Sequence, residues 1–164
     1  MRNAIMAFDL AQHTGWAWCA GDSLYTGVID VSGIASENAH GEMFSRYTVR
    51  LTNLISGVAP QHVYYEDATF AAMKHANQAR CYFGFRALLL GVCFELGVPV
   101  SPVSTSTYKA RAGLSKSDGK NAVIKWCESI KIPVRDDNEA DAVAILNAVL
   151  PDYKVSIDNF TWRK

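Results

Sequence analysis

Residues 4–31 read AIMAFDLAQHTGWAWCAGDSLYTGVIDV, and this stretch decides the fold. It contains three short apolar runs, at 4–9, 15–20 and 24–31, and the last two are separated by the turn signal Ala20-Gly21-Asp22. Short apolar runs bounded by turn residues are typical of β-strands. Because the connections are short, we predict that the three strands pair in sequence as an antiparallel meander.

The rest of the sequence predicts helices alternating with two further strands. The predicted elements are a helix at 37–57, a strand at 62–66, a long helix at 75–96, a strand at 98–103, a short helix and loop at 104–117, and helices near 118–130 and 137–150. This order predicts an α/β fold with a five-stranded mixed sheet flanked by helices. We expect a single domain over 1–164, with its core in 4–150 and a tail, 151–164, without predicted structure.

Composition excludes several protein classes. No apolar run is long enough for a membrane helix, and the N-terminus does not have the pattern of a signal peptide. The four cysteines form no C-x-x-C pair and have no nearby histidine, which argues against a zinc site or a disulfide framework. Buried, reduced thiols in a cytoplasmic protein are the expected arrangement.

Charge is unevenly distributed, although the formal net charge is zero. Residues 73–135 contain ten lysines and arginines but only three acids, whereas acids gather at 66–67 and 136–141. Basic segments beside small acidic clusters would attract a phosphate backbone and still hold cations. A solvated helix face with chance clustering explains the same pattern, so charge alone leaves both interpretations open.

Three acids stand at positions where a metal site is expected. Asp9 and Glu66 each end an apolar strand, and the C-terminal ends of strands are where α/β sheets bind ligands. Asp141 lies early in the last predicted helix, and Asp137 and Asn138 precede it by about one turn, on roughly the same face. Converging carboxylates suit Mg²⁺, and a pair of such ions hydrolyses phosphodiesters in many enzymes.

The same acids have structural explanations. Asp136 and Glu139 have the spacing of a capping box, and acids in a first helical turn suit the helix dipole. Asp9 is equally suited to a turn at the end of a strand. The residues by themselves do not decide between these explanations and a metal site.

Four blocks of the sequence resemble, in order, the RuvC family of Holliday-junction resolvases, especially its small phage-borne members. They are AFDLAQHTGWAW, VYYEDATF, HANQARCYFGFRALLLGVCFELGVPV, and the pair YKARAGLSKSDGKNAVIKW and NEADAVAIL. The resemblance implies an RNase H-like fold, a homodimer, dependence on Mg²⁺ or Mn²⁺, and paired nicks across a four-way DNA junction. It implies catalytic, metal-binding roles for Asp9, Glu66 and Asp141.

The chain departs from the family pattern three residues before Asp141. The family usually has an acid or a histidine there, whereas this sequence has Asn138, preceded by Asp137. We expect Asp137 to be the fourth metal ligand, because losing a negative charge would weaken binding of a second cation; Asn138 as a neutral ligand or DNA contact is the alternative.

The resemblance also implies a DNA-binding surface. Lys120 matches a family lysine near the scissile phosphate and is expected to be catalytic by neutralising charge there. Phe70 falls near a family aromatic that wedges into the junction. The expected DNA contacts are Phe70, Lys74, Arg80, Lys109, Arg111, Lys116 and Lys120. The apolar residues of 75–96 cover more than one helix face, as expected for a helix that contacts both the sheet and a second subunit.

These observations lead to three hypotheses. The first is a homodimeric endonuclease that resolves four-way DNA junctions with two Mg²⁺ ions per active site, for which Mn²⁺ can substitute. The second is another RNase H-like nuclease, acting on flaps or RNA–DNA hybrids. The third is a non-catalytic module that binds branched DNA.

Overall fold

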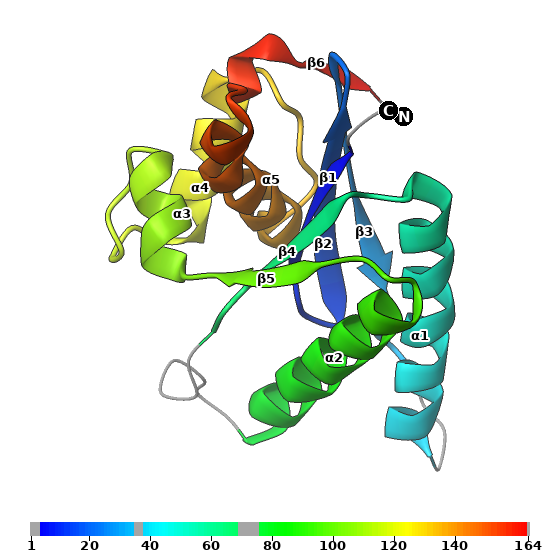
Figure 1. Ribbon diagram of the computed structural model, residues 1–164. Coiled ribbons are helices and arrows are strands. Elements are labelled where there is room, and N and C mark those ends of the chain that lie inside the picture. The colour runs from blue at the N-terminus through cyan, green and yellow to red at the C-terminus, as the bar shows by residue number, and fades with distance from the viewer. Residues whose placement is uncertain (1–3, 35–37, 69–75, 164) are drawn as a thin grey trace.

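The computed structural model describes residues 4–34, 38–68 and 76–163 (Figure 1). Its centre is a sheet in the order β5-β4-β1-β2-β3-β6. The strands are β1 (Ile5–Asp9), β2 (His13–Ala20), β3 (Ser23–Asp30), β4 (His62–Glu66), β5 (Val100–Val103) and β6 (Thr161–Arg163).

The predicted meander is confirmed. β1 pairs antiparallel with β2, and β2 pairs antiparallel with β3. On the other side of β1, β4 is parallel to both β1 and β5. Gly21, at the turn between β2 and β3, has a positive φ of 63°, a conformation that glycine adopts without strain.

The prediction of five strands was wrong, because the sheet has six. The additional strand, β6, lies in the C-terminal segment for which no structure was predicted, and it pairs in parallel with the start of β3. The indole Nε1 of Trp162 donates a hydrogen bond to Thr26 Oγ1 at 3.2 Å, and Ile157 is buried in the core. A strand of three residues is too short to show an alternating pattern, so this pairing depends on tertiary contacts.

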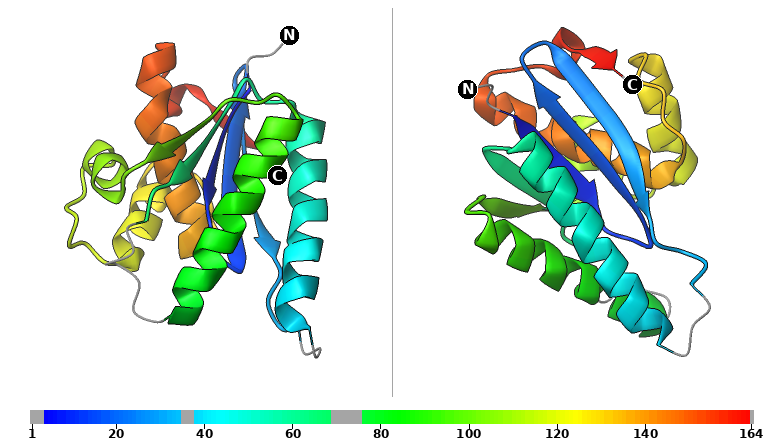
Figure 2. Two further views of the ribbon diagram at one scale, coloured as in Figure 1. Left: turned by 60° about the horizontal axis from the view of Figure 1, so that its bottom comes forward. Right: turned by 90° about the vertical axis from the view of Figure 1, so that its right-hand side faces the viewer.

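Helices cover both faces of the sheet (Figures 1 and 2). α1 (Ala39–Val58) and α2 (Ala76–Glu95) pack together on one face. α5 (Asp137–Val149) crosses the other face, with α3 (Thr105–Arg111) and α4 (Lys120–Ser129) packed against it. None of the helices in the described part of the chain is long and apolar enough to cross a membrane.

A hydrophobic core lies on each face of the sheet, one under α1 and α2 and the other under α5, and side chains of β1 alternate between them. Met6 and Phe8 belong to the cluster under α1 and α2, whereas Ile5 and Ala7 belong to the cluster under α5. Asp9 continues the second series, so the period of two directs its carboxylate to the α5 face. The same alternation applies to β4, where Val63 and Tyr65 face α1 and α2, and Tyr64 faces α5.

Alanines allow α5 to lie close to the sheet. Ala140 and Ala144 of the helix and Ala7 and Ala17 of the strands are all fully buried in one cluster. Small residues on both sides let the helix backbone approach the strands, and close packing of such an interior stabilises the contact. The first turns of α5 are thereby held over the end of β1 and the start of β2.

Candidate active site

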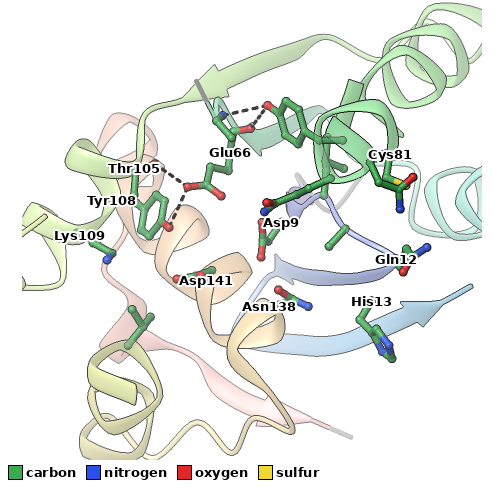
Figure 3. Close-up of a pocket in the computed structure, with 17 residues that line it drawn as sticks. Asp9, Gln12, His13, Glu66, Cys81, Thr105, Tyr108, Lys109, Asn138 and Asp141 are labelled. Carbon is green, nitrogen blue, oxygen red and sulfur yellow. Dashed lines mark hydrogen bonds between the residues drawn. The ribbon is translucent and has the colours of Figure 1, made fainter. Parts of the chain in front are cut away.

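A cavity of about 820 Å³ opens at the C-terminal ends of β1 and β4 (Figure 3). Its lining includes the three predicted catalytic acids, Asp9 from β1, Glu66 from β4 and Asp141 from α5. In Figure 3 their carboxylates face a common space. Residues far apart in the sequence therefore line one pocket, and their binding of a metal ion stays a prediction.

Neighbouring strands place Asp9 beside Glu66. β1 and β4 are parallel, with Phe8 opposite Tyr65, so the following residue on each strand is an acid. Asp9 is only 8% exposed, and its side chain is directed to the α5 face by strand alternation. Two carboxylates at adjacent strand ends are thus fixed by backbone pairing.

Gly15 brings α5 to this edge of the sheet. It is the β2 partner of Asp9, and a Cβ atom added to it would lie 1.9 Å from the carbonyl oxygen of Asn138 and 2.6 Å from the backbone nitrogen of Glu139. No side chain fits in that space. The absence of a Cβ at Gly15 therefore permits the first turn of α5 to contact β2, one turn before Asp141.

Capping residues fix where α5 begins. The side chain of Asp136 accepts a hydrogen bond from the Glu139 amide at 2.8 Å, which is half of the predicted capping box. The Glu139 carboxylate accepts from the Arg135 amide at 2.6 Å, one residue earlier than a capping box requires. Asp136 and Glu139 thus have a structural role, whereas Asp141 lines the cavity.

Asn138, and not Asp137, lines the cavity together with Asp141. Asp137 is the first residue of α5 and is partly exposed. The spacing of three residues places Asn138 on the same helix face as Asp141. The structure thus brings Asp9, Glu66 and Asp141 together and presents Asn138 beside them.

Glu66 is held by three hydroxyl groups. Thr105 Oγ1 donates to Glu66 Oε1 at 2.6 Å, and the Tyr108 hydroxyl donates to the same oxygen at 3.1 Å. The hydroxyl of Tyr82, on α2, donates to the Glu66 carbonyl oxygen at 2.8 Å and accepts from the Ala68 amide at 3.0 Å. Both the side chain and the backbone of Glu66 are therefore fixed.

The pKa of the Tyr108 hydroxyl is raised by its surroundings, which include all three acids. Burial raises the pKa of its hydroxyl far above the ordinary tyrosine value, and the negative charges of Asp141, Glu66 and Asp9 raise the pKa further. Its side chain is 1% exposed. The hydroxyl is consequently protonated at any physiological pH and acts as a donor to Glu66.

The donor chemistry of the cavity fits a hard divalent cation, because carboxylate oxygens are the ligands that Mg²⁺ prefers. Within residues 4–34, 38–68 and 76–163, no three histidine, cysteine, aspartate or glutamate side chains form a group that could hold a metal ion as they lie. Mg²⁺ is usually held by one or two carboxylates together with water and substrate phosphates, so it does not require such a group.

The predicted basic residues have different positions. Lys109 lines the cavity, but its ammonium group donates to the carbonyl oxygen of Asp118 at 2.6 Å and so closes the loop between α3 and α4. Arg111 and Lys116 are exposed on α3 and this loop, and Arg80 is exposed on the first turn and a half of α2. Lys120 is the first residue of α4. Phe70 and Lys74 lie outside the described residues.

Thr105 and Tyr108 were not among the site residues predicted from the sequence. Both lie on α3, which directly follows β5, the strand beside β4. The end of the strand at 103 could have indicated them, because a helix that starts there begins next to the end of β4. Without the pairing of β4 with β5, nothing in the sequence connects these hydroxyls with Glu66.

Comparison with known proteins identifies the fold. A scan against models of protein families finds no match to the sequence, and a search among curated proteins finds none. Among solved structures, Thermus thermophilus RuvC is similar with a TM-score of 0.69 at 20% identity, over 92% of this chain and 96% of that one. T. thermophilus RuvC in complex with a Holliday junction substrate has a TM-score of 0.73 at 19% identity, over 92% and 95%.

A eukaryotic protein has the same architecture. The yeast mitochondrial Holliday junction resolvase Ydc2 is similar with a TM-score of 0.61 at 12% identity, over 88% of this chain and 77% of that one. Identities this low establish the fold alone. The chain has the RNase H-like fold of RuvC, as predicted from the order of its sequence blocks.

Proposed function

We propose that this protein is a structure-selective endodeoxyribonuclease that resolves four-way DNA junctions by metal-dependent phosphodiester hydrolysis. The observation that carries the proposal is the meeting of Asp9, Glu66 and Asp141 in one open cavity. The fold adds support, because a similar structure contains RuvC with a Holliday junction substrate.

Asp9, Glu66 and Asp141 would hold two Mg²⁺ ions, for which Mn²⁺ could substitute. When bound, these ions supply a nucleophilic water at neutral pH and stabilise charge on the leaving oxygen. The protein positions the carboxylates through strand pairing, Gly15 and the hydroxyls on Glu66. The position of Asn138 on the cavity wall favours it over Asp137 as the fourth polar group.

DNA would approach along α3 and the loop that leads to α4. Arg111 and Lys116 are exposed there, Lys109 holds the loop closed, and α4 begins with Lys120. Lysines and arginines at such positions bind backbone phosphates and orient the nucleic acid without reading its sequence. Lys120 is proposed to neutralise charge near the scissile phosphate.

Removing two of these charges should weaken junction binding and its dependence on salt. We expect Arg111→Ala with Lys116→Ala to lower the slope of log K against log salt by about 0.9 for each lost phosphate contact. Fluorescence anisotropy with a labelled junction in Ca²⁺ across a salt series measures this slope. Arg163→Ala, at the far end of the sheet, is the matched control and should leave it unchanged. Equal slopes for all three proteins would contradict the assigned surface.

A homodimer would place two active sites on one junction, and the outer face of α2 suits this assembly. Phe83, Ala87, Leu90 and Phe94 form a seam with spacings of four, three and four residues, the pattern of helices that pack against each other. All four are exposed, and Phe94 is 83% exposed. Phe85 and Leu89 of the same helix are fully buried in the core cluster that α2 shares with α1 and the sheet, so α2 is apolar on two sides.

A charge in this α2 seam should break the dimer. We expect Phe94→Glu to change the protein from twice the mass of the 164-residue chain to that of one chain, because each subunit would bury an unpaired carboxylate in the interface. Sedimentation equilibrium measures the mass. Val49→Glu, at an exposed position of α1, should remain dimeric. A wild type that sediments as a monomer would contradict the assembly.

The proposed activity is tested by cleaving synthetic four-way junctions, flaps and RNA–DNA hybrids in Mg²⁺. We expect paired nicks in opposing strands of the junction and far slower cleavage of the other substrates. Faster cleavage of hybrids or flaps would contradict the junction as the preferred substrate and would indicate a nuclease that acts on the faster-cleaved substrate. Junction binding with no cleavage of any substrate would instead indicate a DNA-binding module.

A further inference from the structure

Two donors occupy one oxygen of Glu66. Thr105 Oγ1 and the Tyr108 hydroxyl both donate to Oε1, at 2.6 and 3.1 Å. An ionised carboxylate has about four acceptor sites, two on each oxygen. The two hydroxyls therefore fill the acceptor capacity of Oε1, and a cation could bind that oxygen only by displacing one of them.

The donors are held in place by packing and capping. Tyr108 is 1% exposed and belongs to the core cluster under α5, so its ring cannot rotate away without opening that core. Thr105 is the first residue of α3, whose start is fixed by Ser104, the N-cap that accepts a hydrogen bond from the Thr107 amide at 3.2 Å. The Tyr108 hydroxyl therefore cannot leave Glu66 without disturbing the core, and the backbone of Thr105 is held at the start of α3.

The acceptor is equally fixed. Tyr82 bridges the Glu66 carbonyl oxygen and the Ala68 amide, and Asp67 between them is paired with Arg86 at 3.4 Å. The backbone at the end of β4 is therefore tied to α2 while the carboxylate is tied to α3. Such a side chain presents one oxygen, Oε2, to an incoming ligand.

We propose that Thr105 and Tyr108 are positioning residues that limit Glu66 to binding a cation through Oε2 alone, and that they thereby select Mg²⁺ and Mn²⁺ against Ca²⁺. The inference rests on the proposed metal site. Mg²⁺ demands octahedral geometry, and carboxylate-rich octahedral sites also suit Mn²⁺; Ca²⁺ takes six to eight ligands and often binds both oxygens of a carboxylate. When one oxygen of Glu66 is occupied by the two hydroxyls, Ca²⁺ loses the affinity that it would gain from binding both oxygens, whereas Mg²⁺ and Mn²⁺ lose less.

The two hydroxyls can be removed with little change in shape. Tyr108→Phe keeps the buried ring, and Thr105→Val keeps the branched side chain. In the double variant Oε1 loses both donors, and loss of such supporting hydrogen bonds lowers metal affinity by about 10–100-fold. Because the freed Oε1 lets Ca²⁺ regain bidentate binding, we expect the loss to fall on Mn²⁺ more than on Ca²⁺, so that the affinity for Ca²⁺ relative to Mn²⁺ rises. Isothermal titration calorimetry with MnCl₂ and CaCl₂, without DNA, measures the ratio.

Two controls separate the hydroxyls from general effects. Thr105→Ser retains both donors and should keep the wild-type ratio. Tyr153→Phe removes a hydroxyl from a different hydrogen bond, the 2.8 Å contact between Tyr153 and Tyr64, and should also leave the ratio unchanged. Circular dichroism verifies that each variant is folded before titration.

The outcomes distinguish this inference from the proposed function. A double variant that binds Mn²⁺ with the wild-type Ca²⁺ to Mn²⁺ ratio would overturn the selection by Thr105 and Tyr108 and leave the metal site standing. A wild type that binds no Mn²⁺ would overturn the metal site itself, and the inference with it. A ratio shifted in the double variant, but not in Thr105→Ser or Tyr153→Phe, supports both.

Discussion

Asp141→Asn is expected to lower the rate of junction cleavage by about 10³-fold or more, because it removes a charged ligand from the acid cluster. Stabilisation by a bound metal contributes several kcal/mol to such reactions, and about 1.4 kcal/mol corresponds to a factor of ten in rate. The substitution keeps the size of the side chain, so the packing of α5 should persist. Single-turnover cleavage of a labelled four-way junction in Mg²⁺ measures the effect.

Binding distinguishes a lost ligand from a lost fold. The variant should bind the junction in Ca²⁺ with an affinity close to that of the wild type, because the basic residues of α3 and the following loop are unchanged. Asp152→Asn, at an exposed position after α5, is the matched control and should cleave normally. If Asp141→Asn cleaves as fast as the wild type, the assigned acid cluster is wrong.

Gly15→Ala should damage both stability and activity. The added Cβ would lie 1.9 Å from the Asn138 carbonyl oxygen, and that neighbour is backbone, so β2 and α5 must separate. Overpacking of this kind costs about 3 kcal/mol at the upper end of its usual range. Since α5 carries Asp141, the substitution should also displace this carboxylate from the site. A misplacement of about 1 Å can lower the rate of a reaction by about 10²-fold, so we expect cleavage to fall by at least about tenfold.

Urea denaturation measures the loss of stability, and Gly57→Ala is its control. Gly57 lies in α1, and no atom lies within 4 Å of a Cβ added there. Alanine within a helix raises the free energy of unfolding by about 0.5–1 kcal/mol relative to glycine, so this variant should be slightly more stable than the wild type. A Gly15→Ala protein with wild-type stability and activity would show that the close contact of β2 with α5 does not position the site.

Much of the site was predictable because strand alternation is strict. Asp9 and Glu66 end apolar strands, and pairing of parallel strands places their ends together, which requires no knowledge of side-chain packing. Asp141 was harder to place, since a helix start rich in acids is also explained by capping. The structure separates the two roles, with Asp136 and Glu139 in the cap and Asp141 in the cavity.

Other features depend on contacts that the sequence does not reveal. The choice between Asp137 and Asn138 turns on the rotation of α5 about its axis, and that rotation is set by the alanine packing against β1 and β2. The hydroxyls of Thr105 and Tyr108 reach Glu66 only because β5 pairs with β4. β6 forms beside β3 because Trp162 donates a hydrogen bond to Thr26 and Ile157 packs into the hydrophobic core, and both contacts require the rest of the domain to be folded.

The most direct test of the account is to locate the metal ions. A crystal of the protein soaked in MnCl₂ and measured at the manganese absorption edge yields an anomalous difference map. We expect peaks inside the cavity, in contact with carboxylate oxygens of Asp9, Glu66 and Asp141. Peaks elsewhere, with none in this cavity at Mn²⁺ concentrations that support cleavage, would contradict the proposed metal-dependent nuclease.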